Sequence, residues 1–180
     1  MTPPADLGRE QRGVVRGAAL AAAVSLIVIL AGWLSRDTIV ARSDDPLARL
    51  LLALRLDLAL LACLFVAIGR VAHGRYTSAE DIGGGAAPTE SAPVREGRAQ
   101  LQNTLEQVVL ALPAHLALAT LLPPDRMGVI AALVLLFVAG RIAFTRGYAR
   151  GGPGRAFGFG LTFYPTAAAL LAAAALAIGN

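Results

Sequence analysis

Long apolar runs separated by short polar stretches dominate the pattern of hydrophobic and polar positions along the chain. The runs cover residues 14–35, 47–71, 98–122, 127–149 and 155–178. Each run holds about 20 residues, the length that an α-helix needs to cross the hydrocarbon core of a bilayer. The pattern therefore predicts an all-α membrane protein with five transmembrane helices.

The polar stretches predict where the chain turns. Residues 73–97 form the longest of them and are rich in Gly, Pro, Ser and Glu, which is typical of a flexible surface loop. The sequence GGPG at 151–154 is expected to break the chain before the last run. A cleaved signal peptide is an alternative interpretation of residues 14–35. This run is long for a signal peptide, and no small-x-small cleavage site follows it, which favours a membrane span.

Composition and charge support the membrane assignment. Hydrophobic residues make up 56% of the chain, and the mean hydropathy is +0.63, which excludes an ordinary soluble domain. The net charge of +4 comes from arginine alone, without lysine, and sits in the loops. It predicts contact with anionic lipid headgroups and no nucleic-acid partner. Arginine together with much Ala and Gly is typical of a GC-rich genome, which is a compositional association only. The expected location is a bacterial inner membrane.

The distribution of arginine predicts the orientation in the membrane. If the N-terminus is cytoplasmic and the C-terminus outside, the cytoplasmic ends carry more arginines than the outer ends, as the positive-inside rule requires. The cytoplasmic set is Arg9, Arg12, Arg16, Arg70, Arg75, Arg95, Arg98, Arg146, Arg150 and Arg155, and the outer set is Arg36, Arg42, Arg49 and Arg126.

In this orientation, guanidinium, amide, carboxylate and phenol groups gather at the cytoplasmic ends of the last four runs. The residues are Arg70, Arg98, Asn103, Glu106, Arg141, Tyr148 and Arg155. Several arginines suit the carboxylates of a small ligand, and Glu106 suits a ligand amine. Alternatively, the arginines extend to the headgroups, and Glu106 stabilises the N-terminus of a helix. That alternative explains Asn103 and Glu106 less well than it explains the arginines.

Three sequence stretches together resemble the MAPEG family, the membrane-associated proteins of eicosanoid and glutathione metabolism. They are GRYTSAEDI at 74–82, RAQLQNTLEQ at 98–107 and GRIAFTRGYARGGPGRA at 140–156. The resemblance covers about residues 47–178 and implies a four-helix transmembrane bundle that assembles as a homotrimer. Residues 1–46 would then form a tail, one extra N-terminal transmembrane helix and a short outer loop. The resemblance also implies that glutathione binds between neighbouring subunits near the cytoplasmic face.

The resemblance assigns roles to individual residues. Arg70 and Arg98 resemble arginines that contact glutathione, and Asn103 and Glu106 match the N-x-x-E motif that holds it. Arg98 is one residue further from Asn103 than in the leukotriene-forming members.

Further matches lie in the last two runs. Tyr148 matches the tyrosine before the final loop, and Arg155 matches the arginine that stabilises the glutathione thiolate. Arg141 joins the set because it lies on the same helix face as Tyr148. Phe144 and Phe159 stand where several members have His or Tyr, which argues against prostaglandin-type isomerase chemistry.

The predicted function is that of a glutathione-dependent transferase or peroxidase, acting on a lipophilic electrophile or hydroperoxide that enters from the bilayer. The attacking sulfur belongs to glutathione, so a protein nucleophile or a metal is not required. The alternative is a non-catalytic scaffold or lipid-binding protein that keeps the same fold.

Two buried polar residues give a separate structural prediction. Asp57 and His115 lie at a similar distance from the outer ends of their runs. Because a lone charge inside a membrane is costly, we expect the two side chains to pair, with Arg55 as a possible third member.

Overall fold

The computed structural model describes residues 7–38, 42–84 and 90–179, and its long elements are all α-helices. The helices are α1 (Leu7–Leu34), α2 (Pro46–Leu56), α3 (Leu58–Tyr76), α4 (Ala92–Leu121), α5 (Gly128–Gly147) and α6 (Gly151–Gly179). Short 3-10 helices lie between some of them, and the described part includes η1 (Arg36–Thr38), η3 (Pro124–Arg126) and η4 (Tyr148–Arg150). The prediction of an all-α protein is confirmed.

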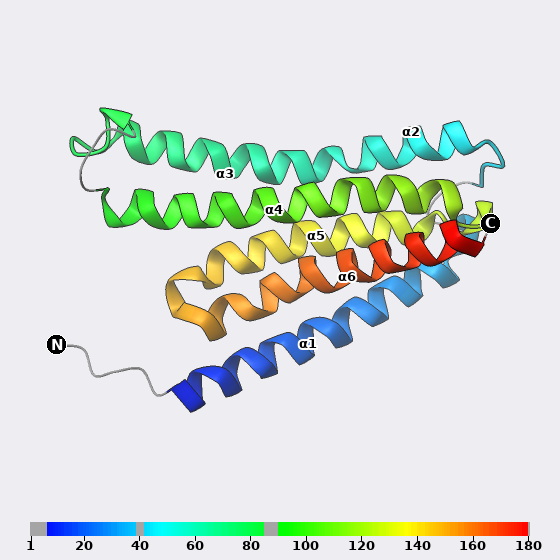
Figure 1. The fold of residues 1–180 in the computed structure, drawn as a ribbon, viewed down its shortest axis with the longest axis horizontal. Helices are drawn as coiled ribbons and strands as arrows, with labels where there is room; N and C mark the ends of the chain where they lie inside the picture. Colours follow the sequence, from blue (N-terminus) through cyan, green and yellow to red (C-terminus); the bar gives the residue numbers. More distant parts are fainter. Residues whose placement is uncertain (1–6, 39–41, 85–89, 180) are drawn as a thin grey trace.

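Four segments of the described chain are long and apolar enough to cross a membrane. They are Leu7–Leu34, Pro46–Tyr76, Ala92–Leu121 and Pro124–Gly179. The second segment combines α2 and α3, which meet at Asp57. The fourth combines α5 and α6, which run in opposite directions and are joined through η4 (Figure 1).

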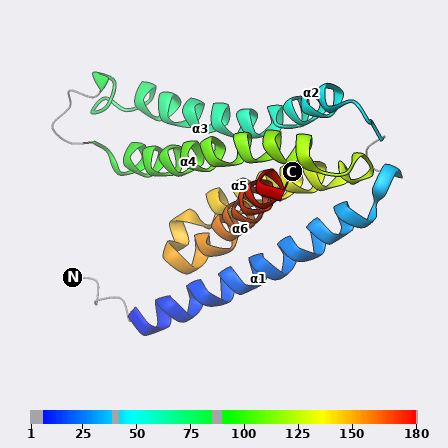
Figure 2. The same cartoon turned by 45° about the vertical axis from the view of Figure 1, so that its right-hand side comes forward.

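The helices lie side by side, with the α2–α3 pair on one side of the bundle and α1 on the other (Figures 1 and 2). The remaining helices fill the space between them: α6 packs against α1, α4 and α5, and α3 packs along α4. The start of α1, the connection between α3 and α4, and η4 all lie at one end of the bundle (Figure 1). We call this the η4 end.

Small residues let α1 pack closely against the rest of the bundle. A Cβ atom added to Gly17 would lie 3.1 Å from the Cβ atom of Ala156 in α6. A Cβ atom on Gly32 would lie 2.7 Å from the carbonyl oxygen of Gly128, at the start of α5. Glycine therefore permits close packing at two points along α1, as it does between helices in membranes.

Two predicted turns differ from the structure. The predicted loop at 73–97 is shorter, because α3 extends to Tyr76 and α4 begins at Ala92. Pro93 lies in the first turn of α4, where a backbone N–H has no hydrogen-bond partner within the helix, so its absence in proline costs no helical hydrogen bond. Residues 85–89 of this loop lie outside the described part.

The predicted break at GGPG comes slightly earlier in the structure. The chain reverses direction in η4, and Gly151 ends that reversal with a φ angle of 76°. The GGPG sequence itself forms the first helical turn of α6.

Asp81 fixes the connection between α3 and α4. Its Oδ1 atom accepts a hydrogen bond from the backbone N–H of Ser91, 3.1 Å away, just before α4 begins. Hydrogen bonds from Ser91 and then Ser78 hold the pKa of the Asp81 carboxyl below its usual value. Asp81 is therefore ionised at neutral pH, as a stable acceptor for these groups requires.

The predicted pairing of Asp57 and His115 is confirmed. The Nδ1 atom of His115 lies 2.7 Å from Oδ1 of Asp57, and each side chain is only 1% exposed. Asp57 stands at the junction of α2 and α3, and His115 faces it from α4. Arg55 does not complete the pair, because its side chain is exposed.

Candidate functional site

A cleft of about 520 Å³ opens between four helices near the η4 end of the bundle. We call it the polar cleft. Its polar side chains are Asn103 of α4, Tyr148 of η4, and Arg155 and Tyr164 of α6. Apolar walls come from α1, through Val14 and Ala18, and from aromatic residues of α5 and α6. Three of the predicted site residues therefore meet around one space.

Arg155 and Tyr148 face each other across the turn between α5 and α6. The guanidinium carbon of Arg155 lies 5.0 Å from the centroid of the Tyr148 ring, which is a cation–π contact. The turn places them there because Gly147 and Gly154 approach so closely that a Cβ atom on either would overlap the backbone of the other. The predicted proximity of the two residues is therefore a property of this glycine-rich turn.

Arg141 lies behind the polar cleft and orients one of its polar groups. Its side chain is buried, and Nη1 donates to Oδ1 of Asn103 at 2.8 Å, whereas Nη2 donates to Oγ1 of Thr162 at 2.6 Å. Because Oδ1 is engaged, Asn103 can offer its NH2 group to a ligand. Sequence analysis missed Thr162, which lies on a different helix from Arg141 and shares no local spacing with it.

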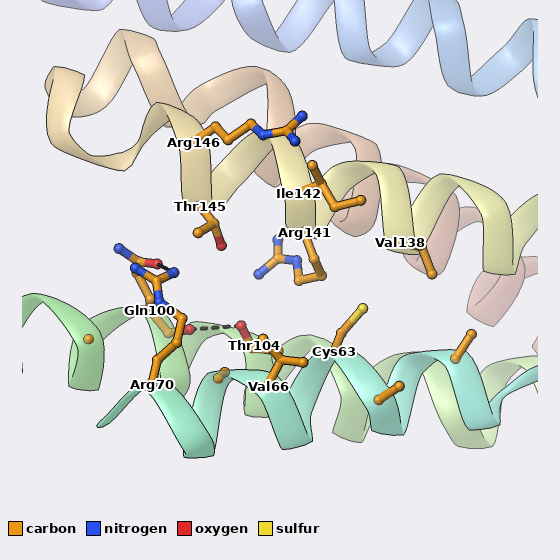
Figure 3. Close-up of a pocket in the computed structure, with 14 residues that line it drawn as sticks. Cys63, Val66, Arg70, Gln100, Thr104, Val138, Arg141, Ile142, Thr145 and Arg146 are labelled. Atoms are coloured by element: carbon orange, nitrogen blue, oxygen red, sulfur yellow. Dashed lines mark hydrogen bonds between the residues drawn. The ribbon is translucent and has the colours of Figure 1, made fainter. Parts of the chain in front are cut away.

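Arg70 lies in a second cavity of about 460 Å³, enclosed by α3, α4 and α5 and lined also by Arg141 (Figure 3). Its Nη1 atom donates to Oε1 of Gln100 at 2.9 Å, and Nε2 of Gln100 donates to Glu96 at 2.9 Å. The predicted single cluster is thus divided between two cavities, with the guanidinium of Arg141 at the boundary.

The remaining two predicted residues lie on the exposed surface of α4. Arg98 forms an ion pair with Glu90, with Nη1 3.0 Å from Oε1. Glu106 accepts a hydrogen bond from Nε2 of Gln102, one turn earlier, at 2.9 Å. Neither Arg98 nor Glu106 lines the polar cleft. Within one chain, the structure therefore does not bring the whole N-x-x-E motif to the cleft.

The polar cleft favours an anionic ligand. Arg155 is the charged group among the residues that line it, and no carboxylate accompanies it there. The aromatic rings of Phe144 and Tyr148 meet edge to face, with centroids 5.4 Å apart, and form a rigid wall. The arrangement can hold a small anion near the η4 end of the bundle while an apolar group lies against the aromatic side.

Comparison with protein families gives a match to the MAPEG family over residues 50–175. Neither the search of curated proteins nor that of solved structures found a match. The matched segment runs from α2 to α6 and includes all seven predicted site residues, whereas α1 lies outside it. Since this match covers most of the chain, the protein belongs to the MAPEG family.

Proposed function

We propose that the protein is an integral membrane enzyme that uses glutathione against a lipophilic electrophile or hydroperoxide. The observation that carries the proposal is the polar cleft, where an amide, two phenols and a guanidinium line one space and no lining residue is a carboxylate. Membership of a family that includes glutathione transferases and peroxidases supports it. The scaffold alternative is favoured only by Phe144 and Phe159, which make the cleft less polar.

The chemistry requires ionisation of the glutathione thiol. A nearby guanidinium favours the thiolate, so Arg155 would lower the thiol pKa of bound glutathione. With an electrophile, the thiolate sulfur forms a bond to carbon and the leaving group departs with its electron pair. With a hydroperoxide, the thiolate sulfur forms a bond to the terminal oxygen and the O–O bond breaks. The products are a sulfenic acid on glutathione and an alkoxide, which takes up the proton released when the thiol ionised and leaves as the alcohol. A second glutathione then converts the sulfenic acid to a disulfide and water.

We further propose five membrane crossings, with α5 and α6 each crossing once. Their lengths of 20 and 29 residues correspond to about 30 and 43 Å, enough for a bilayer core. Residues 47–178 would form the four-helix domain. Residues 1–46 would add α1 as an extra span. We propose that the η4 end faces the cytoplasm and the C-terminus lies outside, in a bacterial inner membrane. The arginine distribution supports this orientation.

A homotrimer would explain why two of the predicted glutathione-binding residues are exposed. Arg98 and Glu106 lie on the surface of α4, so they can reach glutathione only if it also contacts a neighbouring subunit. The small residues of 167–177 on α6 allow close helix approach between chains. We expect the mass of the solubilised protein to be that of three chains. A monomer would argue strongly against a site shared between subunits.

Glu106→Gln is expected to weaken glutathione binding by about 1–3 kcal/mol, the value of a charge-assisted hydrogen bond to a ligand amine. Isothermal titration of the solubilised oligomer would measure it. Glu80→Gln is the matched control, because Glu80 is also exposed but lies in the connection between α3 and α4. Unchanged affinity in both variants would assign Glu106 a structural role.

Glutathione binding by the wild-type protein tests the proposal most directly. The purified protein should bind glutathione and show the ultraviolet absorbance of a thiolate near neutral pH. It should also conjugate a generic aromatic electrophile. Binding without thiolate or turnover would favour the scaffold alternative, and absence of binding would refute the glutathione proposal.

A further inference from the structure

The second cavity differs in character from the polar cleft. Its long wall is apolar and comes from Ala59, Ala62, Cys63 and Val66 of α3, with Val138 and Ile142 of α5 opposite (Figure 3). Arginines lie toward its η4 end, whereas none of its lining residues is acidic. We call it the leaflet cavity.

The dimensions of the leaflet cavity match one half of a bilayer. Ala59 and Arg70 both line it and are eleven positions apart on α3, which corresponds to about 16 Å along the helix. The hydrocarbon core of a bilayer is about 30 Å thick, so one leaflet contributes about 15 Å. Val66 is 60% exposed and Ile142 46%, so the cavity opens between α3 and α5 toward the lipid.

A buried positive charge in the leaflet cavity lacks a counter-ion. Arg141 is 5% exposed, and its terminal nitrogens donate to Asn103 and Thr162, which are both neutral. Within the described residues, no carboxylate lies within ion-pair distance of it, and its Nε atom is buried without a partner. A buried guanidinium without an anion is costly, especially at membrane depth. An anion at this end of the cavity would reduce that cost.

We propose that the leaflet cavity binds one anionic phospholipid of the surrounding membrane. An acyl chain lies along the apolar wall, and the phosphate lies at the η4 end beside Arg70 and near Arg141 (Figure 3). Arg146 also lines this end of the cavity. In the proposed orientation this end faces the cytoplasmic leaflet, which carries the anionic lipids. Because Arg141 also holds Asn103, the bound lipid would stabilise one wall of the polar cleft from behind.

The test compares binding of phosphatidylglycerol and phosphatidylcholine with identical acyl chains to the detergent-solubilised full chain by native mass spectrometry. Phosphatidylglycerol should bind more tightly. Arg146→Gln should weaken it about fivefold, the equivalent of about 1 kcal/mol per arginine at a lipid surface. Arg150→Gln is the control, since Arg150 is an exposed arginine of η4 that does not line the cavity. Its affinity should equal that of the wild type.

A second pair of variants tests the cavity itself. Ala62→Phe fills it, whereas Leu61→Phe adds bulk to the neighbouring exposed position outside it. Only Ala62→Phe should lose the lipid. Cys63 provides an independent readout, because it lines the cavity and is the single cysteine of the chain. Phosphatidylglycerol should slow its reaction with a maleimide.

Four results with added lipid or phosphate would overturn the proposal, and a fifth would come from lipid-free protein. The four are equal binding of both phospholipids, unchanged binding in Ala62→Phe, stronger competition by oleate than by phosphatidylglycerol, and saturation by inorganic phosphate alone. Protection of Cys63 in lipid-free oligomer would show that a second copy of the chain covers the cavity, which also refutes lipid binding. None of these measurements uses glutathione, so the two proposals can fail independently.

Discussion

Arg155→Ala is expected to slow conjugation of glutathione to a generic electrophile by about 100-fold or more, the usual effect of removing one preorganised group that stabilises a charged reactant. Glutathione affinity should fall much less. The guanidinium acts mainly on the ionised sulfur, so its contribution grows with the charge at the reacting atom. The thiolate absorbance of bound glutathione near neutral pH should fall in parallel with turnover.

Arg150→Ala is the matched control for this prediction. Arg150 is also exposed and lies in η4, five positions before Arg155, but it does not line the polar cleft. Its loss should leave turnover and thiolate absorbance unchanged. Because Arg155 is itself exposed, its removal does not open a hole in the core, so a folded variant is expected. If the Arg155 variant matched wild type in both measurements, Arg155 would have no part in the mechanism.

The sequence predicted the position of the site residues along the bundle better than it predicted which neighbouring helix each side chain faces. Arg70, Asn103, Tyr148 and Arg155 all lie toward one end of the bundle, as helix lengths and the arginine pattern require. Depth follows from a rise of 1.5 Å per residue and is fixed once the spans are known. The helix that each side chain faces depends on the rotation of its own helix, which distant packing determines.

Asn103 and Glu106 illustrate this limit. A spacing of three residues places them on adjoining parts of α4. Asn103 is nevertheless held inward by Arg141, whereas Glu106 remains at the surface with Gln102. The inward contact joins residues 38 positions apart, so no local pattern could indicate it. The same reason explains why Arg70 and Arg141 form part of a different cavity from Arg155.

The turn between α5 and α6 shows a second kind of limit. GGPG was expected to interrupt the helices, because both residue types usually do so. Proline is tolerated in the first turn of a helix, however, and Pro153 occupies that turn of α6. Gly154 makes the close contact with Gly147, and Gly151 supplies the positive φ angle at the end of the turn. Composition located the turn within a few residues, but only the packing of α5 on α6 explains its exact position.

His115→Ala is expected to destabilise the protein by about 3–5 kcal/mol, because it leaves the carboxylate of Asp57 buried without its partner. Asp57 is 1% exposed, and its Oδ2 atom already lacks a hydrogen bond, so the loss of the contact to His115 would leave the whole carboxylate unpaired. Reversible denaturation of the solubilised protein would measure the effect. Asp125→Ala is the control, because it removes a partly exposed ion pair with Arg126 and should change stability by at most about 1 kcal/mol.

The double variant Asp57→Leu/His115→Ala distinguishes loss of packing from loss of pairing. If the cost of His115→Ala comes from an unpaired buried carboxylate, replacing that carboxylate with an apolar group should restore part of the stability. If the cost comes only from the volume of the imidazole, the double variant should be no more stable than the single one. Recovery would show that the Asp57–His115 pair joins α2, α3 and α4 through its charge balance. In that case, Asp57 without His115 would be worse for the fold than the absence of both residues.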